Sequence, residues 1–436
     1  MAYTKYSLTP ASNNAAPPDG APEGMLPSAV NDTMRDMMSQ IRDCGDGIRG
    51  GTYTMTAPVI TGGSVTGVTF SSSSATITGG TITGVTDITV ADGGTGASTV
   101  AAAQTNLQVF NFKNRIINGD MRIDQRNAGA SLTITGGIYT LDRWIAYASQ
   151  SSKYTVQQNA GSVTLPAGFI NYLGATSSAA TAVGSSDYFN IQQQIEGLNI
   201  ADLGWGTANA KTVTLSFQVY SSLTGTFGGS LRNSADNRSY PFTYTVSSSN
   251  TWTSISITIA GDTSGTWLTT NGVGIKMSFG LGVGSTYSGT AGAWAGAQYL
   301  SSTGATSVVG TNGATFYITG VQLEVGSSAT GFEYNDYGRQ LIQCQRYYET
   351  YATAGNSTLY RWYGGVGTEV CTIFPMQVTK RAAPTMAAGS GFTENNCTGT
   401  GFSDVTINSY RLLTITATLG MCSFLSYSKI TMSAEL

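Results

Sequence analysis

A nine-residue unit that occurs twice near the N-terminus limits what this chain can fold into. Residues 60–68 read Ile-Thr-Gly-Gly-Ser-Val-Thr-Gly-Val, and residues 77–85 read Ile-Thr-Gly-Gly-Thr-Ile-Thr-Gly-Val. Each copy has few aliphatic side chains, so one copy alone cannot offset an ordering entropy of roughly 1–2 kcal/mol per residue. Stacked repeats, or identical chains wound together, can bury those side chains along a shared axis. The repeat therefore predicts a fibre segment, and a homotrimer.

The composition favours a mainly β protein. Of 436 residues, 41% are apolar, enough for real cores, but only 10% are charged, and glycine is abundant at 55 residues. Many short strands and turns with an uncharged polar surface produce such a composition, whereas long helices bring Glu, Lys and Ala. We expect a short N-terminal helix, a Gly/Thr-rich repeat shaft, a jelly-roll-like β-sandwich and a second small β domain.

Charge and residue types exclude several functions. The net charge is −3, which gives no basic field for nucleic acid, and histidine is absent. Without histidine, the usual nucleophile pairs and imidazole metal sites are lost, so we expect no cofactor, no metal and no catalytic residue. The N-terminus has no apolar signal run and no stretch is long and apolar enough to span a membrane, which predicts a soluble protein made in a bacterial cytoplasm.

The five cysteines, at positions 44, 344, 371, 397 and 422, are odd in number and form no C-x-x-C pair. Synthesis in a cytosol favours buried free thiols. A disulfide among the last four stays open.

An amphipathic helix is predicted over residues 28–43. Pro27 or Ser28 suits its start, and Gly45 suits the position just past its end. The apolar stripe on one face consists of Val30, Met34, Met37, Met38 and Ile41. About four turns are too few for a stable isolated helix. The stripe could pack on its own domain, but docking on another protein or forming a short parallel bundle is favoured.

Changes in composition and in hydrophobic pattern divide the chain into segments. Residues 1–50 form an extended arm plus the helix, 51–90 the shaft, and 91–107 a collar with a short helix. Residues 108–336 alternate apolar and polar side chains with Gly and Ser turns between, which predicts a β-sandwich with strands at 212–220, 252–259, 275–281 and 315–325. Trp144 and Trp252 are expected in its core.

Residues 337–436 are predicted to form the small β domain. A short helical turn is expected at 339–346, followed by strands at 347–351, 369–376, 410–419 and 421–428.

Three stretches resemble phage tail-fibre proteins. Residues 16–25 with 28–35 look like the virion-attachment end, and Gly93-Gly94-Thr95-Gly96 with the residues up to Leu107 is similar to a linker of phage adhesins. Residues 114–126, followed by Tyr139-Thr140-Leu141-Asp142-Arg143-Trp144, resemble the start of a distal fibre β-sandwich, and residues 343–349 resemble the segment after it. The resemblance implies a trimeric virion fibre whose N-terminus binds the tail and whose C-terminal domains meet the host. It carries over no catalytic residue.

Three functions remain open at this point. The leading one is a tail fibre, a non-enzymatic adhesin whose C-terminal β domains bind a host-surface glycan or protein. The alternatives are a glycan-degrading tailspike-like enzyme, which needs only paired carboxylates, and a structural virion fibre that meets no receptor. Sugar binding uses exposed aromatic faces. The candidates are Tyr360, Trp362 and Tyr363 in a loop or hairpin, with Trp294 and Tyr188 as weaker ones. Burial of Tyr360 and Trp362 by strand alternation is an equal alternative.

Overall fold

The computed structural model describes residues 26–49, 103, 112–351, 357–389, 392–426 and 429–436. The chain divides into two compact units, Met1–Val85 and Thr86–Leu436. The predicted shaft at 51–90 and nearly all of the predicted collar at 91–107 lie outside the described residues.

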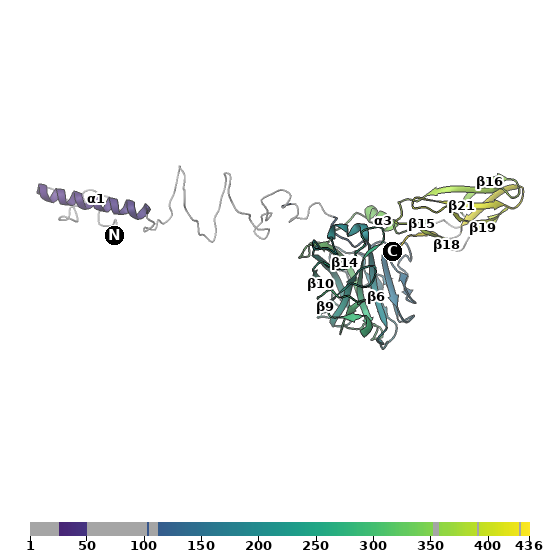
Figure 1. Cartoon of the computed structure of the whole chain (residues 1–436), viewed down its shortest axis with the longest axis horizontal. Coiled ribbons are helices and arrows are strands. Elements are labelled where there is room, and N and C mark those ends of the chain that lie inside the picture. Colours follow the sequence, from purple (N-terminus) through teal and green to yellow (C-terminus); the bar gives the residue numbers. More distant parts are fainter. Residues whose placement is uncertain (1–25, 50–102, 104–111, 352–356, 390–391, 427–428) are drawn as a thin grey trace. The chain divides into compact units, whose positions relative to one another are not determined.

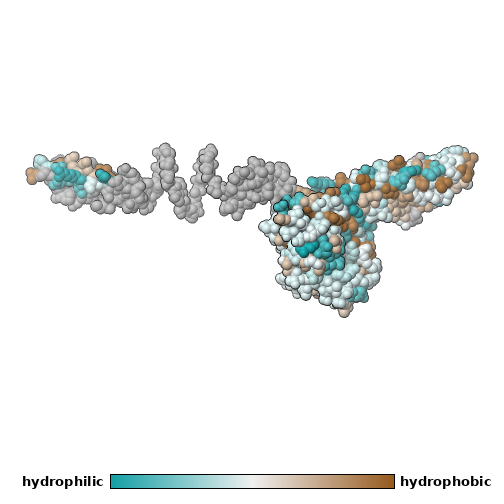
Figure 2. Space-filling model, in the orientation of Figure 1, coloured by the Kyte–Doolittle hydropathy of each residue, from teal (hydrophilic) through white to brown (hydrophobic). Residues whose placement is uncertain are grey.

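The first unit contributes one described helix, α1 (Pro27–Arg49). Its start at Pro27 agrees with the predicted start, but Gly45 lies inside the helix rather than beyond its end. One glycine costs a helix only about 1 kcal/mol, so it is a weak stop signal. Val30, Met34, Met37, Met38 and Ile41 are all exposed, and α1 shows both apolar and polar patches on its surface (Figure 2). Neither described helix is long and apolar enough to cross a membrane.

Two six-stranded antiparallel sheets form the predicted β-sandwich (Figure 1). The first sheet has the order β1 (Leu132–Thr133), β4 (Tyr154–Gln158), β5 (Leu173–Ser177), β14 (Thr315–Val325), β7 (Val213–Ser221), β10 (Thr253–Ile259). The second has the order β2 (Ile138–Tyr139), β3 (Trp144–Ala148), β6 (Tyr188–Glu196), β11 (Val273–Val283), β8 (Gly225–Arg232), β9 (Ser239–Val246). Four single-turn 3-10 helices lie in the connections: η4 (Ala160–Ser162), η5 (Gly197–Asn199), η6 (Ala201–Leu203) and η7 (Ser285–Tyr287).

The core lies between these sheets and follows the period-two pattern of the sequence. Along β7, Val213, Leu215, Phe217 and Val219 are all buried, as their alternation predicts. Phe217 meets Phe279 of β11 in the opposite sheet, with ring centroids 4.9 Å apart in an edge-to-face arrangement. Burying each such side chain contributes about 1.5–3 kcal/mol, so this layer holds the two sheets together.

The two tryptophans expected in the core differ in how deeply they are buried. Trp144 is fully buried, and its indole donates to the carbonyl of Asn118. Trp252 is half-buried and stands edge-on to Tyr172, with its indole donating to the carbonyl of Thr164. Only the first is a core residue of the sandwich.

The C-terminal strands form three small antiparallel sheets. After the helix α3 (Tyr337–Gln345), one sheet has the order β15 (Tyr348–Tyr351), β23 (Ile430–Ser433), β18 (Thr385–Ala388). The other two have the orders β16 (Ser357–Gly364), β22 (Gly420–Ser426), β19 (Phe392–Asn395) and β17 (Glu369–Pro375), β21 (Ser409–Thr416), β20 (Cys397–Ser403). The predicted helical turn and the predicted strands β15, β17, β21 and β22 are present within a few residues of their expected bounds.

The cysteine prediction is partly wrong. Cys344, Cys397 and Cys422 are free and buried, as expected, but Cys371 is free and exposed. It lies on β17, where exposed and half-buried residues alternate, and its position in that alternation turns it to solvent. The side chain of Cys44 lies outside the description.

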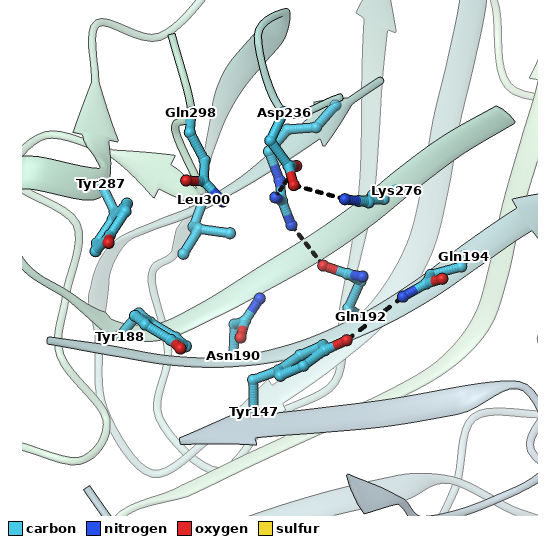
Figure 3. Close-up of a pocket in the computed structure, with 11 residues that line it drawn as sticks. Tyr147, Tyr188, Asn190, Gln192, Gln194, Asp236, Lys276, Tyr287, Gln298 and Leu300 are labelled. Atoms are coloured by element: carbon cyan, nitrogen blue, oxygen red, sulfur yellow. Dashed lines mark hydrogen bonds and ion pairs between the residues drawn. The ribbon is translucent and has the colours of Figure 1, made fainter. Parts of the chain in front are cut away.

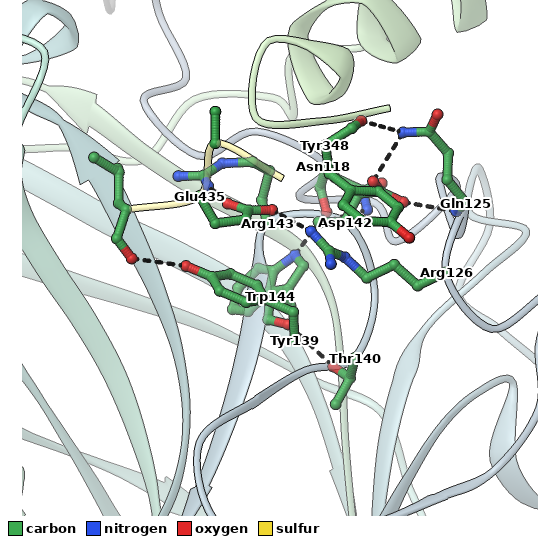
Figure 4. Close-up of polar contacts among 12 residues, drawn as sticks. Asn118, Gln125, Arg126, Tyr139, Thr140, Asp142, Arg143, Trp144, Tyr348 and Glu435 are labelled. Carbon is green, nitrogen blue, oxygen red and sulfur yellow. Dashed lines mark hydrogen bonds and ion pairs between the residues drawn. The ribbon is translucent and has the colours of Figure 1, made fainter. Parts of the chain in front are cut away.

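A polar cluster joins the C-terminal strands to the sandwich (Figure 4). Arg126 donates to Glu435 at 2.6 Å, and Arg143 donates to the other carboxylate oxygen of Glu435. The guanidinium carbons lie 3.5 Å from the ring centroid of Tyr348 and 3.6 Å from that of Tyr347, respectively. We call these five residues the joint. Cation–π contacts add to the ion pairs there because the site is largely shielded from water.

The stretch that resembles fibre sandwiches builds this joint. The side chain of Asn118 accepts from the Ile123 amide at 2.9 Å and donates to the carbonyls of Ile123 and Asp142. Gln125 donates to both carboxylate oxygens of Asp142, at 2.7 Å from its amide and 2.9 Å from its side chain, and also to the carbonyl of Tyr348. These bonds fix the loop that positions Arg126 and Arg143, so the motif has a structural role.

Candidate functional site

A groove of about 200 Å³ opens on the outer face of the second sheet (Figure 3). Along β6, Phe189, Ile191 and Ile195 point into the core, so Asn190, Gln192 and Gln194 take the opposite face. The strand register sets three rows across the sheet: Tyr147–Asn190–Gly280, Gln192–Ser278–Ser230, and Gln194–Lys276–Arg232. The floor of the groove is therefore a patch of polar side chains on a rigid sheet.

A short ribbon and its flanking loop close one side of the groove. β12 (Ser288–Gly289) pairs in parallel with β13 (Ser301–Ser302), and the loop between supplies Gln298 and Leu300. The ribbon approaches the sheet where Gly280 lacks a side chain, since a Cβ there would lie 2.7 Å from the Ser301 hydroxyl. Tyr188 and Tyr287 also line the groove, edge to face with ring centroids 5.5 Å apart.

Two cations and one carboxylate occupy one end of the groove. Arg232 donates to Asp236, and Lys276 donates to the other oxygen of that carboxylate at 2.6 Å. Arg232 also donates to the Gln192 side-chain oxygen at 2.5 Å, which fixes the direction of that amide. Burial lowers the pKa of Arg232 from its ordinary value against the opposing effect of Asp236. The guanidinium is thus held rigidly and largely out of water.

Asn190 is the unusual residue of the groove. It is 1% exposed, and neither its Oδ1 nor its Nδ2 has a hydrogen-bond partner within the described part of the chain. In Figure 3 its amide points into the groove. Nearby, Gln194 donates to the Tyr147 hydroxyl at a long 3.4 Å, so this contact is weak. Buried amides normally find partners, so the groove presents unused hydrogen-bonding capacity.

The joint fixes the strand that carries these amides. Arg143 donates to the carbonyl of Gln194, and Arg346 holds the Glu196 carboxylate with two hydrogen bonds, of 2.9 and 2.6 Å. The Tyr347 hydroxyl donates to Glu196 at 2.5 Å. The end of β6 is therefore bonded to the C-terminal part of the chain.

The structure does not bring together the five aromatic residues that the sequence singles out. Tyr188 lines the groove, while Trp294 is half-buried among Trp205, Trp267 and Tyr240. Tyr360, Trp362 and Tyr363, expected in a loop or hairpin, lie on the strand β16, which pairs with β22.

The residues of β16 differ in burial. Trp362 is half-buried and donates to the Thr416 hydroxyl at 3.1 Å, as strand alternation allows. Tyr363 is 72% exposed, and the side chain of Tyr360 is outside the description.

Sequence reasoning missed most of the groove. Asn190, Gln192 and Gln194 share one face of β6, but Gln193 between the last two hides the alternation in the sequence. The residues Arg232, Asp236 and Lys276 come from separate strands and a turn, and only the register of β8 and β11 reveals that they meet. Within the described ranges, no group of three or more His, Cys, Asp or Glu could hold a metal ion.

No known protein family matches the chain, and no curated protein sequence matches it. Among solved structures, it is similar to the enzymatically active domain of tailspike protein 4 of bacteriophage CBA120, at 13% identity and a TM-score of 0.28, over 49% of this chain and 21% of that one. The aligned part thus spans about a fifth of the tailspike chain.

Two further similar structures are of modules that match over nearly their whole length. A putative sugar-binding protein from Bacteroides thetaiotaomicron aligns at 12% identity and a TM-score of 0.29, over 49% of this chain and 100% of that one. A family 11 carbohydrate-binding module from Clostridium thermocellum, in complex with a tetrasaccharide, aligns at 9% identity and a TM-score of 0.23, over 45% and 97%. Such low values carry no information on what this chain binds.

Proposed function

We propose that this chain is a phage tail fibre that binds a host-surface glycan in the groove on the outer face of the β-sandwich. The observation that carries the glycan proposal is Asn190, whose buried amide has no partner among the described residues. A buried polar group left unsatisfied costs about 1–3 kcal/mol. A ligand rich in hydroxyl groups removes that cost, because each hydroxyl both donates and accepts.

The other lining residues fit the same ligand class. Gln192, Gln194 and Gln298 offer amides that donate and accept, and Tyr147, Tyr188 and Tyr287 offer ring faces for the C–H surfaces of a sugar. At about 200 Å³, the groove lies below the roughly 300–1,000 Å³ that is usual for pockets of drug-sized ligands. We therefore expect it to recognise one sugar unit within a longer chain.

Binding without cleavage is part of the proposal. Glycoside hydrolysis needs two carboxylates that flank the scissile bond, about 5–10 Å apart. Asp236 is the sole carboxylate among the residues that line the groove, and both of its oxygens are engaged by Arg232 and Lys276. With both oxygens bonded to cations, Asp236 offers no oxygen to protonate a leaving group or to activate a water.

The virion role rests on the order of the three fibre-like stretches and on α1. The exposed stripe of α1 has the spacing of a helix that packs against another helix, and we propose that it anchors the fibre and joins the chains of a homotrimer. Three grooves on one fibre would then raise the avidity for a repeating glycan by about 10²–10⁴-fold over a single site.

A glycan array probed with the full chain tests the site. We expect Tyr188→Ala to weaken binding about tenfold, the equivalent of one lost aromatic contact. Tyr363→Ala is the matched control, because this tyrosine is exposed on β16 and outside the groove. If Tyr363→Ala weakens binding and Tyr188→Ala does not, the binding site lies on the C-terminal strands instead. Absence of any binding would favour a purely structural fibre, and release of new reducing ends would favour an enzyme.

A further inference from the structure

The charges in the groove do not balance. Arg232 and Lys276 face one carboxylate, that of Asp236, and the remaining lining residues are Tyr, Asn, Gln and Leu. The groove therefore carries one excess positive charge in a chain whose net charge is −3. Lys380 and Arg238 each pair with a carboxylate of their own, Glu349 and Asp262, whereas Arg126 and Arg143 of the joint share Glu435.

This excess charge lies where water screens it poorly. The side chain of Arg232 is 3% exposed and that of Lys276 is 15% exposed. A cation held out of water without full compensation is costly, and an anion that enters the site lowers that cost. The same positive spot would also draw an anionic ligand toward the groove.

Lys276, the more exposed of the two cations, still has a proton that can be donated to a ligand. Lys276 donates to Asp236 at 2.6 Å and to the carbonyl of Ser234 at 3.1 Å. These bonds use two of its three protons, which leaves one for a ligand. By contrast, the two terminal nitrogens of Arg232 are directed at Asp236, Gln192 and Ser278. The Nε of Arg232 has no partner among the described residues but is buried, so Lys276 is the cation that an anion in the groove can contact, while Arg232 holds the frame.

We propose that the groove selects a sugar unit that carries an anionic group, either a carboxylate or a phosphate. The anionic group binds Lys276, and the ring hydroxyls bind the amides of Asn190 and Gln194. This inference rests on the proposed glycan-binding function and narrows the ligand to acidic surface polysaccharides.

The test compares matched charged and uncharged ligands on the full chain. One arm titrates oligogalacturonate against its methyl ester, a second titrates sialyllactose against its methyl ester, and a third titrates glucose 6-phosphate against glucose. We expect the charged member of at least one pair to bind about tenfold or more tightly than its neutral partner, and its affinity to fall as salt rises. The first two arms report a carboxylate and the third reports a phosphate.

Lys276→Gln is the decisive variant. We expect it to abolish the preference for the charged ligand, while Lys211→Gln, on an exposed lysine outside the groove, leaves it intact. A melting temperature within a few degrees of wild type shows that the variant folds, and the neutral ligand serves as a control that does not depend on charge.

The outcomes separate the two proposals. If the charged and the neutral ligand of each pair bind equally, and Tyr188→Ala abolishes the binding of both, the anionic preference is overturned and glycan binding in the groove stands. A charge preference that survives Lys276→Gln also overturns the inference. If no ligand, charged or neutral, binds on these arms or on the array, both proposals fail.

Discussion

Arg143 and Glu435, 292 positions apart in the sequence, form an ion pair in which both side chains are buried. The pair belongs to the joint between the sandwich and the C-terminal strands. Arg143 also bonds to the carbonyl of Gln194, whose side chain lines the groove. One buried guanidinium therefore links the C-terminal end of the described chain to the strand that forms the groove floor.

Glu435→Gln should destabilise the protein strongly. The substitution leaves Arg126 and Arg143 without their shared carboxylate, and breaking a buried pair in this way costs about 3–5 kcal/mol. The free energy of unfolding from a urea titration measures the effect. Glu369→Gln is the matched control, because Glu369 and Arg411 form a solvent-screened pair at 3.6 Å that contributes little to stability. Similar losses in both variants would contradict a buried role for Glu435.

Asn190→Ala should lower glycan affinity without lowering stability. The free protein gains by losing a buried amide that has no partner among the described residues, which offsets the small cavity that the substitution leaves. Asn118→Ala provides the contrast, because its amide makes several hydrogen bonds, and we expect it to lose about 1–3 kcal/mol. Melting temperatures and array binding measure the two effects. A large loss of stability in Asn190→Ala would show that its amide is satisfied.

Asp142 should make stability fall as the pH rises from about 4 to about 6. Burial raises the pKa of Asp142 to about 6, against the opposing effects of Arg126 and of the hydrogen bonds from Gln125. A carboxyl whose pKa is higher in the folded state than in the unfolded state stabilises the fold while protonated, and that contribution is lost as the pH rises through the folded pKa.

The measurement is the difference in unfolding free energy between wild type and Asp142→Asn at several pH values. We expect the wild type to lose about 1–3 kcal/mol relative to the variant between pH 4 and pH 6.5, since one unit of pKa shift corresponds to about 1.4 kcal/mol. A difference that is constant with pH would show that Asp142 is ionised throughout.

Cys371 should react with a thiol reagent in the native protein. It is exposed on β17, whereas Cys344, Cys397 and Cys422 are buried, and burial raises the pKa of Cys344 well above its ordinary value. In a Cys44→Ser background, we expect one fast-reacting thiol per chain in native buffer and all four in denaturant. Loss of the fast phase in Cys371→Ser would identify it, and a fast phase that persists would contradict the assignment.

The apolar stripe of α1 should control assembly. Replacing Met34, Met38 and Ile41 with glutamine keeps a high helix propensity but removes the exposed apolar surface. We expect light scattering to give the mass of about three chains for the wild type and a smaller mass for the triple variant at micromolar concentration. Arg35→Gln, on the same helix but outside the stripe, should assemble as wild type. An unchanged mass in the triple variant would place the contacts between chains elsewhere.

The sequence predicted those parts of the fold that depend on local pattern. The period-two alternation of Val213, Leu215, Phe217 and Val219 was enough to place β7 and its buried face. The end of α1 was misplaced because Gly45 is only weakly unfavourable within a helix.

The groove and the joint depend on distant residues and were not predictable. Arg232 and Lys276 meet because of strand register, and Glu435 reaches Arg143 because the chain returns to the sandwich after the C-terminal strands. The aromatic residues of β16 are sugar-binding candidates by residue type alone, but Trp362 is half-buried and its indole donates to Thr416. Of the five aromatic candidates, only Tyr188 lines the groove.

β6 forms the groove floor and is also bonded to the joint. We therefore expect substitutions on β6 to be tolerated less well than substitutions in the loops that line the groove. β6 carries the backbone carbonyl of Gln194 and the carboxylate of Glu196, so a substitution that shifts this strand also disturbs their bonds to Arg143 and Arg346. Asp236, in the turn after β8, and Gln298, in the loop before β13, face the same groove without such ties to the joint. For the proposed fibre, we therefore expect adaptation to a new host to accumulate in these loops rather than on β6.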